Sequence, residues 1–167
     1  LKNYLNMEMW HNTCTDFHGG DMKRILFINP SLRLKSPTKF LPVGIASVMT
    51  YLETYQIDFD FLDVDINELE DSQIEDYLDQ NRYDIILSGS IVTHYKWMKW
   101  LTHTVRKYNE NSVIIIGNSV AGSIPNLFLK NSCADIAILG EGEVTSLELV
   151  KRILKDEPWE NLDGLAF

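Results

Sequence analysis

The sequence predicts an α/β fold, a doubly wound five-stranded parallel sheet of the flavodoxin-like or Rossmann-like kind, with helices on both faces. Two observations lead to this prediction. From residue 24 onward, short apolar runs rich in β-forming residues alternate with amphipathic stretches, the pattern of consecutive β–α units. The runs 24–29, 83–88 and 113–117 also show no alternation of apolar and polar residues, which is typical of strands buried on both faces. The usual strand order for such a domain is 2-1-3-4-5.

Five predicted strands alternate with five predicted helices along the chain. The strands cover residues 24–29, 57–63, 83–88, 113–117 and 135–139. The helices cover residues 43–55, 71–80, 95–109, 123–131 and 143–155. Apolar side chains at Ile45, Val48, Met49 and Leu52 share one face of the first helix. Asp71 or Ser72 caps the second helix, whose acidic first turn interacts favourably with the helix dipole.

A length of 167 residues corresponds to one domain, which we assign to residues 22–157. Residues 1–21 have no clean period and are treated as an N-terminal extension. Residues 158–167 are expected to begin the connection to a further domain.

The composition excludes several classes of function. Fifteen basic and 24 acidic residues give a net charge of −9, which argues against nucleic acid or an anionic membrane as the main partner. Cys14 and Cys133 are too few for a disulfide scaffold, a four-thiolate zinc site or an iron–sulfur cluster held by this chain alone. No signal peptide or membrane-length apolar run is visible, so we expect a reduced, cytoplasmic protein.

In this fold a ligand lies beyond the carboxyl ends of the strands. The connections at that edge are residues 30–42, 89–94, 117–124 and 140–142. The first carries no GxGxxG or GxxxxGK[ST] pattern and is either a surface loop or a lid over a bulky ligand. The third contains almost only small residues, which a large flat ligand lying against backbone would need. The fourth connection, judged from its residue types alone, is expected to be mostly a turn.

Hydroxyl residues follow the third strand and could donate to a ligand. They are Ser88, Ser90 and Thr93, and Gly89 between them permits close approach. Thr93 could equally cap the next helix, and the two roles are compatible.

Metal and nucleophile signals are weak. His11, Cys14 and His18 have suggestive spacings, but a fourth ligand is missing, so we predict no metal site there. No pattern marks an activated serine, and we predict no catalytic residue in this chain.

Residues 22–167 resemble the N-terminal cobalamin-binding domain of the cobalamin-dependent radical S-adenosylmethionine (SAM) enzymes. The matching pieces come in order along the chain: ILFINP at 25–30, PVGIA at 42–46 with YLE at 51–53, YDII at 83–86, Gly117 and Pro125, GEGE at 140–143 with LEL at 147–149, and LDGLAF at 162–167. Their order and spacing carry the resemblance rather than any single piece.

The resemblance implies a binding site for base-off cobalamin at the carboxyl edge. Residues under the corrin ring would be Pro30, Ser31 and Leu32. Contacts to the nucleotide tail or corrin amides would come from Ser88, Gly89, Ser90 and Thr93. The tail channel would be lined by Gly117, Asn118 and Ser119, and the pocket edge would be closed by Gly140, Glu141, Gly142 and Glu143.

The chain departs from the family pattern in three places. Asn118 stands where the family usually has a second glycine, so a side chain enters the tail channel. Residues 30–39 hold no histidine to bind cobalt, which leaves His94 as the only candidate; the simpler interpretation of His94 is a solvent-facing residue. The Cys-x3-Cys-x2-Cys motif is absent, so the [4Fe–4S] cluster and SAM are expected in a catalytic domain outside this sequence, as partner within one longer chain.

Three other functions occur with this fold. A degenerate domain that no longer binds cobalamin and serves as a scaffold stays open because of Asn118. A flavodoxin-like FMN carrier is less favoured, since PSLRLKSPT is a poor phosphate loop. A signalling receiver needs an acidic pair and a phosphate-accepting Asp, and the corresponding positions hold Asn29 and Ser88, which excludes it.

Overall fold

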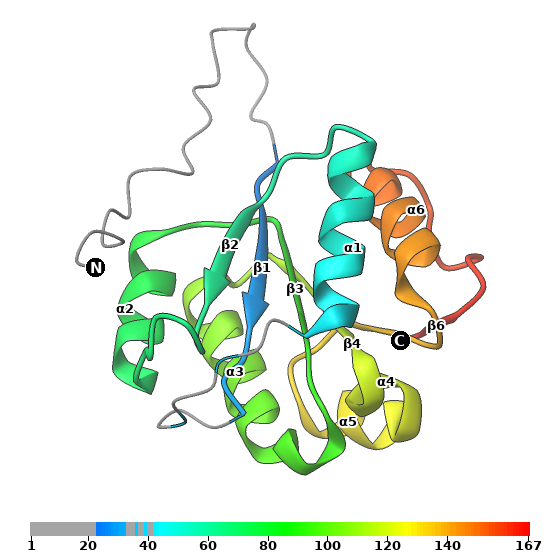
Figure 1. Cartoon of the computed structure of the whole chain (residues 1–167). Helices are drawn as coiled ribbons and strands as arrows, with labels where there is room; N and C mark the ends of the chain where they lie inside the picture. The colour runs from blue at the N-terminus through cyan, green and yellow to red at the C-terminus, as the bar shows by residue number, and fades with distance from the viewer. Residues whose placement is uncertain (1–22, 33–35, 37–38, 40–41) are drawn as a thin grey trace, which may run out of the picture.

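The computed structural model describes residues 23–32, 36, 39 and 42–167, and these form three layers with a sheet in the middle (Figure 1). The strands are β1 (Ile25–Asn29), β2 (Asp60–Asp63), β3 (Ile85–Gly89), β4 (Val113–Gly117), β5 (Ile136–Ile138) and β6 (Leu165–Ala166). The helices are α1 (Val43–Thr54), α2 (Asp71–Gln80), α3 (Tyr95–Tyr108), α4 (Asn118–Ser123), α5 (Pro125–Asn131) and α6 (Gly142–Leu154), with a 3₁₀ turn at Val92–His94.

The strand order is β2-β1-β3-β4-β5-β6, and β1 to β5 are parallel. The predicted order of the first five strands is therefore confirmed, but the sheet has six strands and not five. The sixth, β6, pairs antiparallel with β5 and is too short to show a period in the sequence. Gly164, at φ 81°, lets the chain turn there, and its carbonyl accepts the N–H of Leu139 at 2.8 Å. Part of the segment 158–167 thus extends the sheet.

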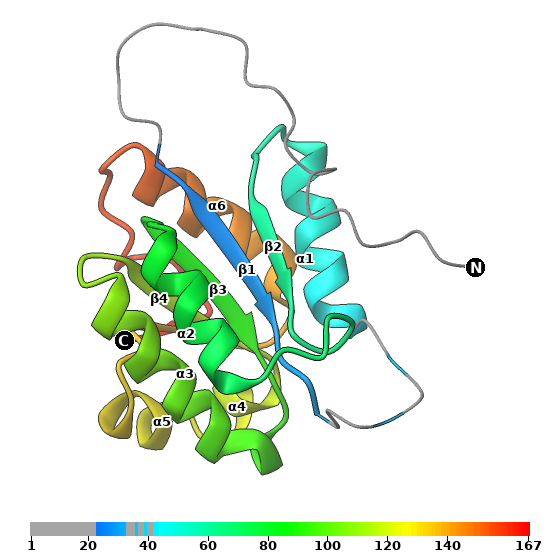
Figure 2. The ribbon, with the colours of Figure 1, turned by 90° about the vertical axis from the view of Figure 1, so that its left-hand side faces the viewer.

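The central strands are buried on both faces, as their unbroken apolar runs predicted. In β1, Leu26 and Ile28 face the layer of α2, α3, α4 and α5, whereas Ile25 and Phe27 face α1 and α6. Figure 2 shows the same two layers of helices on either side of the strands. Every side chain of β1 is thus removed from water, a large apolar contribution to stability.

The prediction of a single helix at 123–131 is wrong about where the helical region begins. Residues 118–123 form α4, and Ile124 separates α4 from α5 because Pro125 disfavours helical backbone in the residue before it. Pro125 itself suits the first turn of α5, where its missing N–H is not needed. The small residues expected to form a loop after β4 are therefore helical.

Among the described residues, no helix is both long and apolar enough to cross a bilayer.

Polar side chains extend the pairing of β1 and β2 beyond the strands. Buried Asn29 donates its amide Nδ2 to Asp63 Oδ1 at 3.0 Å, and two residues further on Ser31 donates to Asp65. Asp63 Oδ1 also accepts the backbone N–H groups of Asp65 and Ile66, both at 3.0 Å. Two buried oxygens there, Asn29 Oδ1 and Asp63 Oδ2, have no hydrogen-bond partner in the described structure.

We expect Asp63→Asn to leave the free energy of unfolding unchanged or to raise it. The amide oxygen can keep the three bonds of Oδ1, while the new N–H can serve Asn29 Oδ1, which lacks a donor. Asp63→Ala should lower the free energy of unfolding by about 1–3 kcal/mol, since the buried donors that bond Oδ1 would lose their acceptor. Urea denaturation of both variants tests this, and equal losses in the two would contradict it.

Candidate functional site

The carboxyl edge of the sheet opens into a cavity of about 280 Å³ between the strand ends and the first turns of α1 and α6. Four parallel strands each contribute one apolar side chain to it: Phe27, Leu87, Ile115 and Ile138. All four lie on the sheet face that α1 and α6 cover. The cavity lies at the switch point between β1 and β3, where ligands bind in this class of fold.

Backbone without side chains forms much of the rim. Gly89 and Gly117 are partners in the β3–β4 register, and a Cβ on Gly89 would lie 3.0 Å from the carbonyl carbon and oxygen of Gly117. A Cβ on Gly117 would meet nothing within 4 Å, so a side chain there has free space at the cavity lining. Gly142, which begins α6, leaves a space where a Cβ would lie 3.4 Å from Val48.

Asn118 adopts the left-handed backbone conformation, with φ 63°. Asparagine tolerates this conformation better than other residues with a side chain, and glycine adopts it without strain. The Asn118 side chain is exposed, and its Oδ1 accepts the N–H of Ser119 at 2.6 Å. The glycine that the family resemblance places here is thus explained by backbone conformation, and Asn118 satisfies the same requirement.

The polar groups of the cavity differ in how they are bonded. Ser88 donates to the carbonyl of Ile28 at 2.9 Å. Glu143 at the mouth accepts a hydrogen bond from Ser47 of α1 at 2.5 Å. This bond and the carboxylate's bond to its own backbone N–H hold the pKa of Glu143 below its usual value. The α1–α6 wall is therefore tied together by a charged group.

Eight of the fourteen predicted cofactor-binding residues line this cavity. They are Ser88, Gly89, Gly117, Asn118, Gly140, Glu141, Gly142 and Glu143. The other six lie outside its lining: Pro30, Ser31, Leu32, Ser90, Thr93 and Ser119.

The predicted cofactor-binding residues that do not line the cavity lie in other environments. Ser31 is buried against Asp65, and Thr93 is exposed in the 3₁₀ turn. Leu32 is 48% exposed at the carboxyl edge. The connection 30–42 lies partly outside the described residues, but Lys39 is placed, and its Nζ lies 3.1 Å from Glu68.

Sequence reasoning missed nine residues that line the cavity: Phe27, Pro42, Gly44, Ile45, Val48, Leu87, Ile115, Ile138 and Ser146. Most are apolar and were interpreted as ordinary core. Those that lie on strands could have been predicted from the alternation of side chains, because every second residue of a buried strand faces the same helical layer.

His94 does not line the cavity. Its Nδ1 lies 3.1 Å from Ser90 Oγ, and its ring stacks on Trp97 with centroids 5.0 Å apart. Burial lowers the pKa of His94, which favours the neutral ring. Among the described residues, no three His, Cys, Asp or Glu side chains are grouped to hold a metal ion. His11, Cys14 and His18 lie outside the described residues.

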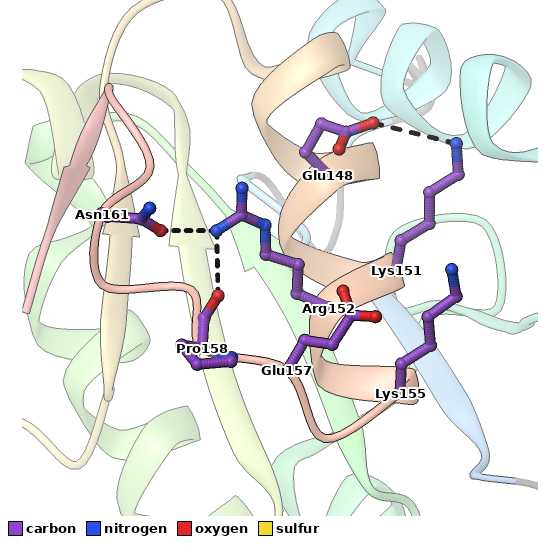
Figure 3. A pocket seen from close by; sticks show the side chains of 7 residues that line it. All are labelled: Glu148, Lys151, Arg152, Lys155, Glu157, Pro158 and Asn161. Atoms are coloured by element: carbon purple, nitrogen blue, oxygen red, sulfur yellow. Dashed lines mark hydrogen bonds and ion pairs between the residues drawn. The ribbon is translucent and has the colours of Figure 1, made fainter.

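A second, open depression lies at the C-terminal end of α6, at the opposite edge of the sheet (Figure 3). Its cations are largely engaged within the protein. Arg152 donates to the carbonyl of Pro158 at 2.9 Å and to Asn161 at 2.5 Å, and Lys151 lies 3.8 Å from Glu148. These contacts fasten the chain after α6 to the helix.

The fold and the cavity define a ligand-binding α/β domain whose site is a small, largely apolar slot at the switch point. Residues 31–150 match the family model of the B12 binding domain. The chain therefore belongs to the B12-binding domain family, and the predicted cofactor class, cobalamin, is that of its family.

Individual relatives extend the comparison. An uncharacterized protein of Methanocaldococcus jannaschii, MJ1620, is 32% identical over 106 residues, which are 64% of this chain and 19% of that protein. The radical SAM methyltransferase TsrM from Kitasatospora setae, solved with cobalamin and a [4Fe–4S] cluster, matches 86% of this chain with a TM-score of 0.73 at 16% identity. The cobalamin-dependent radical SAM enzyme OxsB, solved with aqua-cobalamin, matches 88% with a TM-score of 0.74 at 20% identity.

These structural matches establish the fold. The chain spans 29% of the TsrM chain and 21% of the OxsB chain.

The residues present fit one part of a corrinoid. At about 280 Å³ the cavity is at the low end of ligand pockets and too small for a whole corrin ring. Its apolar floor and glycine rim would admit a flat aromatic group. The exposed apolar side chains Val43 (84%) and Val144 (60%), at the first turns of α1 and α6, provide a surface outside it for a larger ring.

Asn118→Ala should lower the free energy of unfolding by about 1–2 kcal/mol, because alanine is strained at φ 63°. Asn118→Gly should leave it unchanged or raise it. Chemical denaturation measures both, and an alanine variant as stable as the parent would show that the backbone conformation is not the constraint.

The hydrogen bond between Ser47 and Glu143 should make a small pH-dependent contribution to stability. The folded pKa of Glu143 is depressed, so the contribution is full above the unfolded value of about 4.3 and is lost as pH falls through the folded value. Ser47→Ala should therefore be less stable than the parent near pH 7, by under about 1 kcal/mol because the carboxylate meets solvent. Denaturation curves at pH 7 and pH 3 test this: the difference should shrink at pH 3, and a difference independent of pH would contradict it.

Proposed function

We propose that this chain is the cobalamin-binding module of a larger radical SAM enzyme and that it binds cobalamin base-off at the carboxyl edge of the sheet. The observation that carries the proposal is the cavity itself. It lies at the switch point, its floor is apolar, and eight of the residues that the family resemblance implicates line it. Membership of the B12-binding domain family supports the same cofactor.

The size of the cavity supports the base-off form. In that form the nucleotide tail leaves cobalt and can enter the protein as a separate arm. A slot of about 280 Å³ suits such an arm, with Phe27, Leu87 and Ile115 below the aromatic base. The corrin ring would then lie outside the slot, over Leu32 and the first turn of α1.

We also propose that no histidine of this chain binds cobalt. His94 is the only histidine near the carboxyl edge in the described part of the chain, and it is engaged by Ser90 and Trp97 away from the slot. His94→Ala should therefore leave the absorption spectrum of the bound corrinoid unchanged.

The catalytic partner is proposed from the relatives. TsrM and OxsB are named as radical SAM enzymes and are several times longer than the matched region. A radical SAM domain elsewhere in the same polypeptide would hold the [4Fe–4S] cluster and SAM, since this sequence has no Cys-x3-Cys-x2-Cys motif. The reaction of that enzyme, methyl transfer or other radical chemistry, would be set by that domain.

An absorbance titration with hydroxocobalamin followed by desalting tests the binding. We expect the chain to retain corrinoid with a base-off spectrum. Gly117→Leu should weaken binding by at least about tenfold, which corresponds to about 1.4 kcal/mol, because the new side chain would start from the cavity lining at a position where a Cβ meets nothing within 4 Å.

Gly122→Leu on α4 is the matched control, since an added Cβ there also meets nothing within 4 Å and the residue does not line the cavity. Equal affinity of the two variants would place the ligand elsewhere. No retention by the parent chain would favour a scaffold that has lost its cofactor, and retained FMN would favour a flavin carrier.

A further inference from the structure

Two buried oxygen atoms at the end of the β1–β2 pair, Asn29 Oδ1 and Asp63 Oδ2, have no hydrogen-bond partner in the described structure. Asn29 is fully buried, and Asp63 is 5% exposed. The two residues are partners in the parallel register, and the bond from Asn29 Nδ2 to Asp63 Oδ1 at 3.0 Å already joins their side chains. Buried polar atoms in proteins are nearly always satisfied, so this pair indicates a partner that comes from outside the chain.

The charge around the pair is not balanced. Two carboxylates are buried here, Asp63 and Asp65, and the second is 7% exposed. The ammonium group of Lys39 lies 3.8 Å from Asp65 and 3.1 Å from Glu68. Asp63 has no ion-pair partner in the part of the chain that the structure describes. Because a buried carboxylate without a countercharge is costly, one more positive charge would stabilise this corner of the sheet.

The atoms left for a ligand are oxygens. Three N–H groups use Asp63 Oδ1, which leaves Oδ2 as the unused atom of the carboxylate. Asn29 adds the carbonyl oxygen of its amide. Carboxylate and amide oxygens, without nitrogen or sulfur, are the ligands that hard cations such as Ca²⁺ and Mg²⁺ prefer. A neutral hydrogen-bond donor would satisfy the two oxygens but would leave the charge of Asp63 uncompensated.

We propose that Asn29 and Asp63 form a binding site for a hard divalent cation at the carboxyl ends of β1 and β2. Asp63 Oδ2 supplies the charged ligand and Asn29 Oδ1 the neutral one, so the ion links the two strand ends in addition to their backbone pairing. Neither residue lines the slot, and the inference does not rest on the proposed cofactor. With few protein ligands the Kd should be about 0.1–1 mM, the range of weak Ca²⁺ modules.

Equilibrium dialysis of the chelator-treated chain against CaCl₂ or MgCl₂, without corrinoid, measures the binding. We expect one ion bound per chain with a Kd in this range. Either salt should also raise the melting temperature, because the ion binds the folded state, and NaCl at equal ionic strength should not. Comparing the two salts identifies the ion, since Ca²⁺ accepts irregular coordination and Mg²⁺ demands a near-ideal octahedron.

The variant Asp63→Asn separates ion binding from folding. It keeps an oxygen for the three N–H groups and should be as stable as the parent in metal-free buffer. Because it lacks the charged ligand, its Kd for the ion should rise at least about tenfold. Asp76→Asn removes the same charge from an exposed position of α2 and is the matched control, with the Kd of the parent.

Two results would overturn the proposal. One is the absence of bound metal at about 10 mM salt, well above the expected Kd, and the other is an equal Kd for Asp63→Asn and the parent. Either would leave a buried water or a proton as the partner of the two oxygens. Neither would affect the proposed function, because corrinoid binding is measured in a separate titration.

Discussion

The close approach of two glycines where β3 and β4 end is the contact on which the carboxyl edge depends. A Cβ on Gly89 would lie 3.0 Å from the carbonyl of Gly117, tighter than most such contacts, so the two strand ends would have to move apart by a few tenths of an ångström to admit a side chain there. The chain then turns at Asn118 directly into α4, and Val120 donates its N–H to the carbonyl of Ser90 at 3.0 Å. The two connections are thereby fixed to each other, and the rim of the slot is largely backbone.

Small residues also explain why the slot lies on the face of the sheet that α1 and α6 cover. On the face of α2 to α5, Val120, Ala121 and Phe128 are completely buried and fill the layer up to the carboxyl edge. On the other face α1 and α6 pack together, but their first turns contain Gly44 and Gly142. These glycines leave the ends of β1, β3, β4 and β5 uncovered, and the space above Phe27 and Leu87 stays open.

Local patterns in the sequence predicted the alternating elements and the two buried faces of the strands, because both follow from periodicity within a few residues. The strand order and the edge where the cavity lies were then predicted from the usual arrangement of that fold class. Features that depend on distant contacts were missed. The two residues of β6 gain their structure from β5, and Ser146 faces the cavity only because α6 packs beside β5. Asn118 was interpreted as an obstacle because its side chain is visible in the sequence, whereas its φ of 63° is not.

The carboxyl edge keeps an open space between its helices and the sheet. The open space beside Gly142 makes the protein alone less stable than a version with that space filled would be. The opposite sheet face, packed with Val120 and Phe128, shows how closely this sequence can fill a layer. Proteins tolerate such local costs mainly at functional sites. The contrast between the open slot and the filled opposite face is therefore an argument, independent of family membership, that a ligand completes this edge.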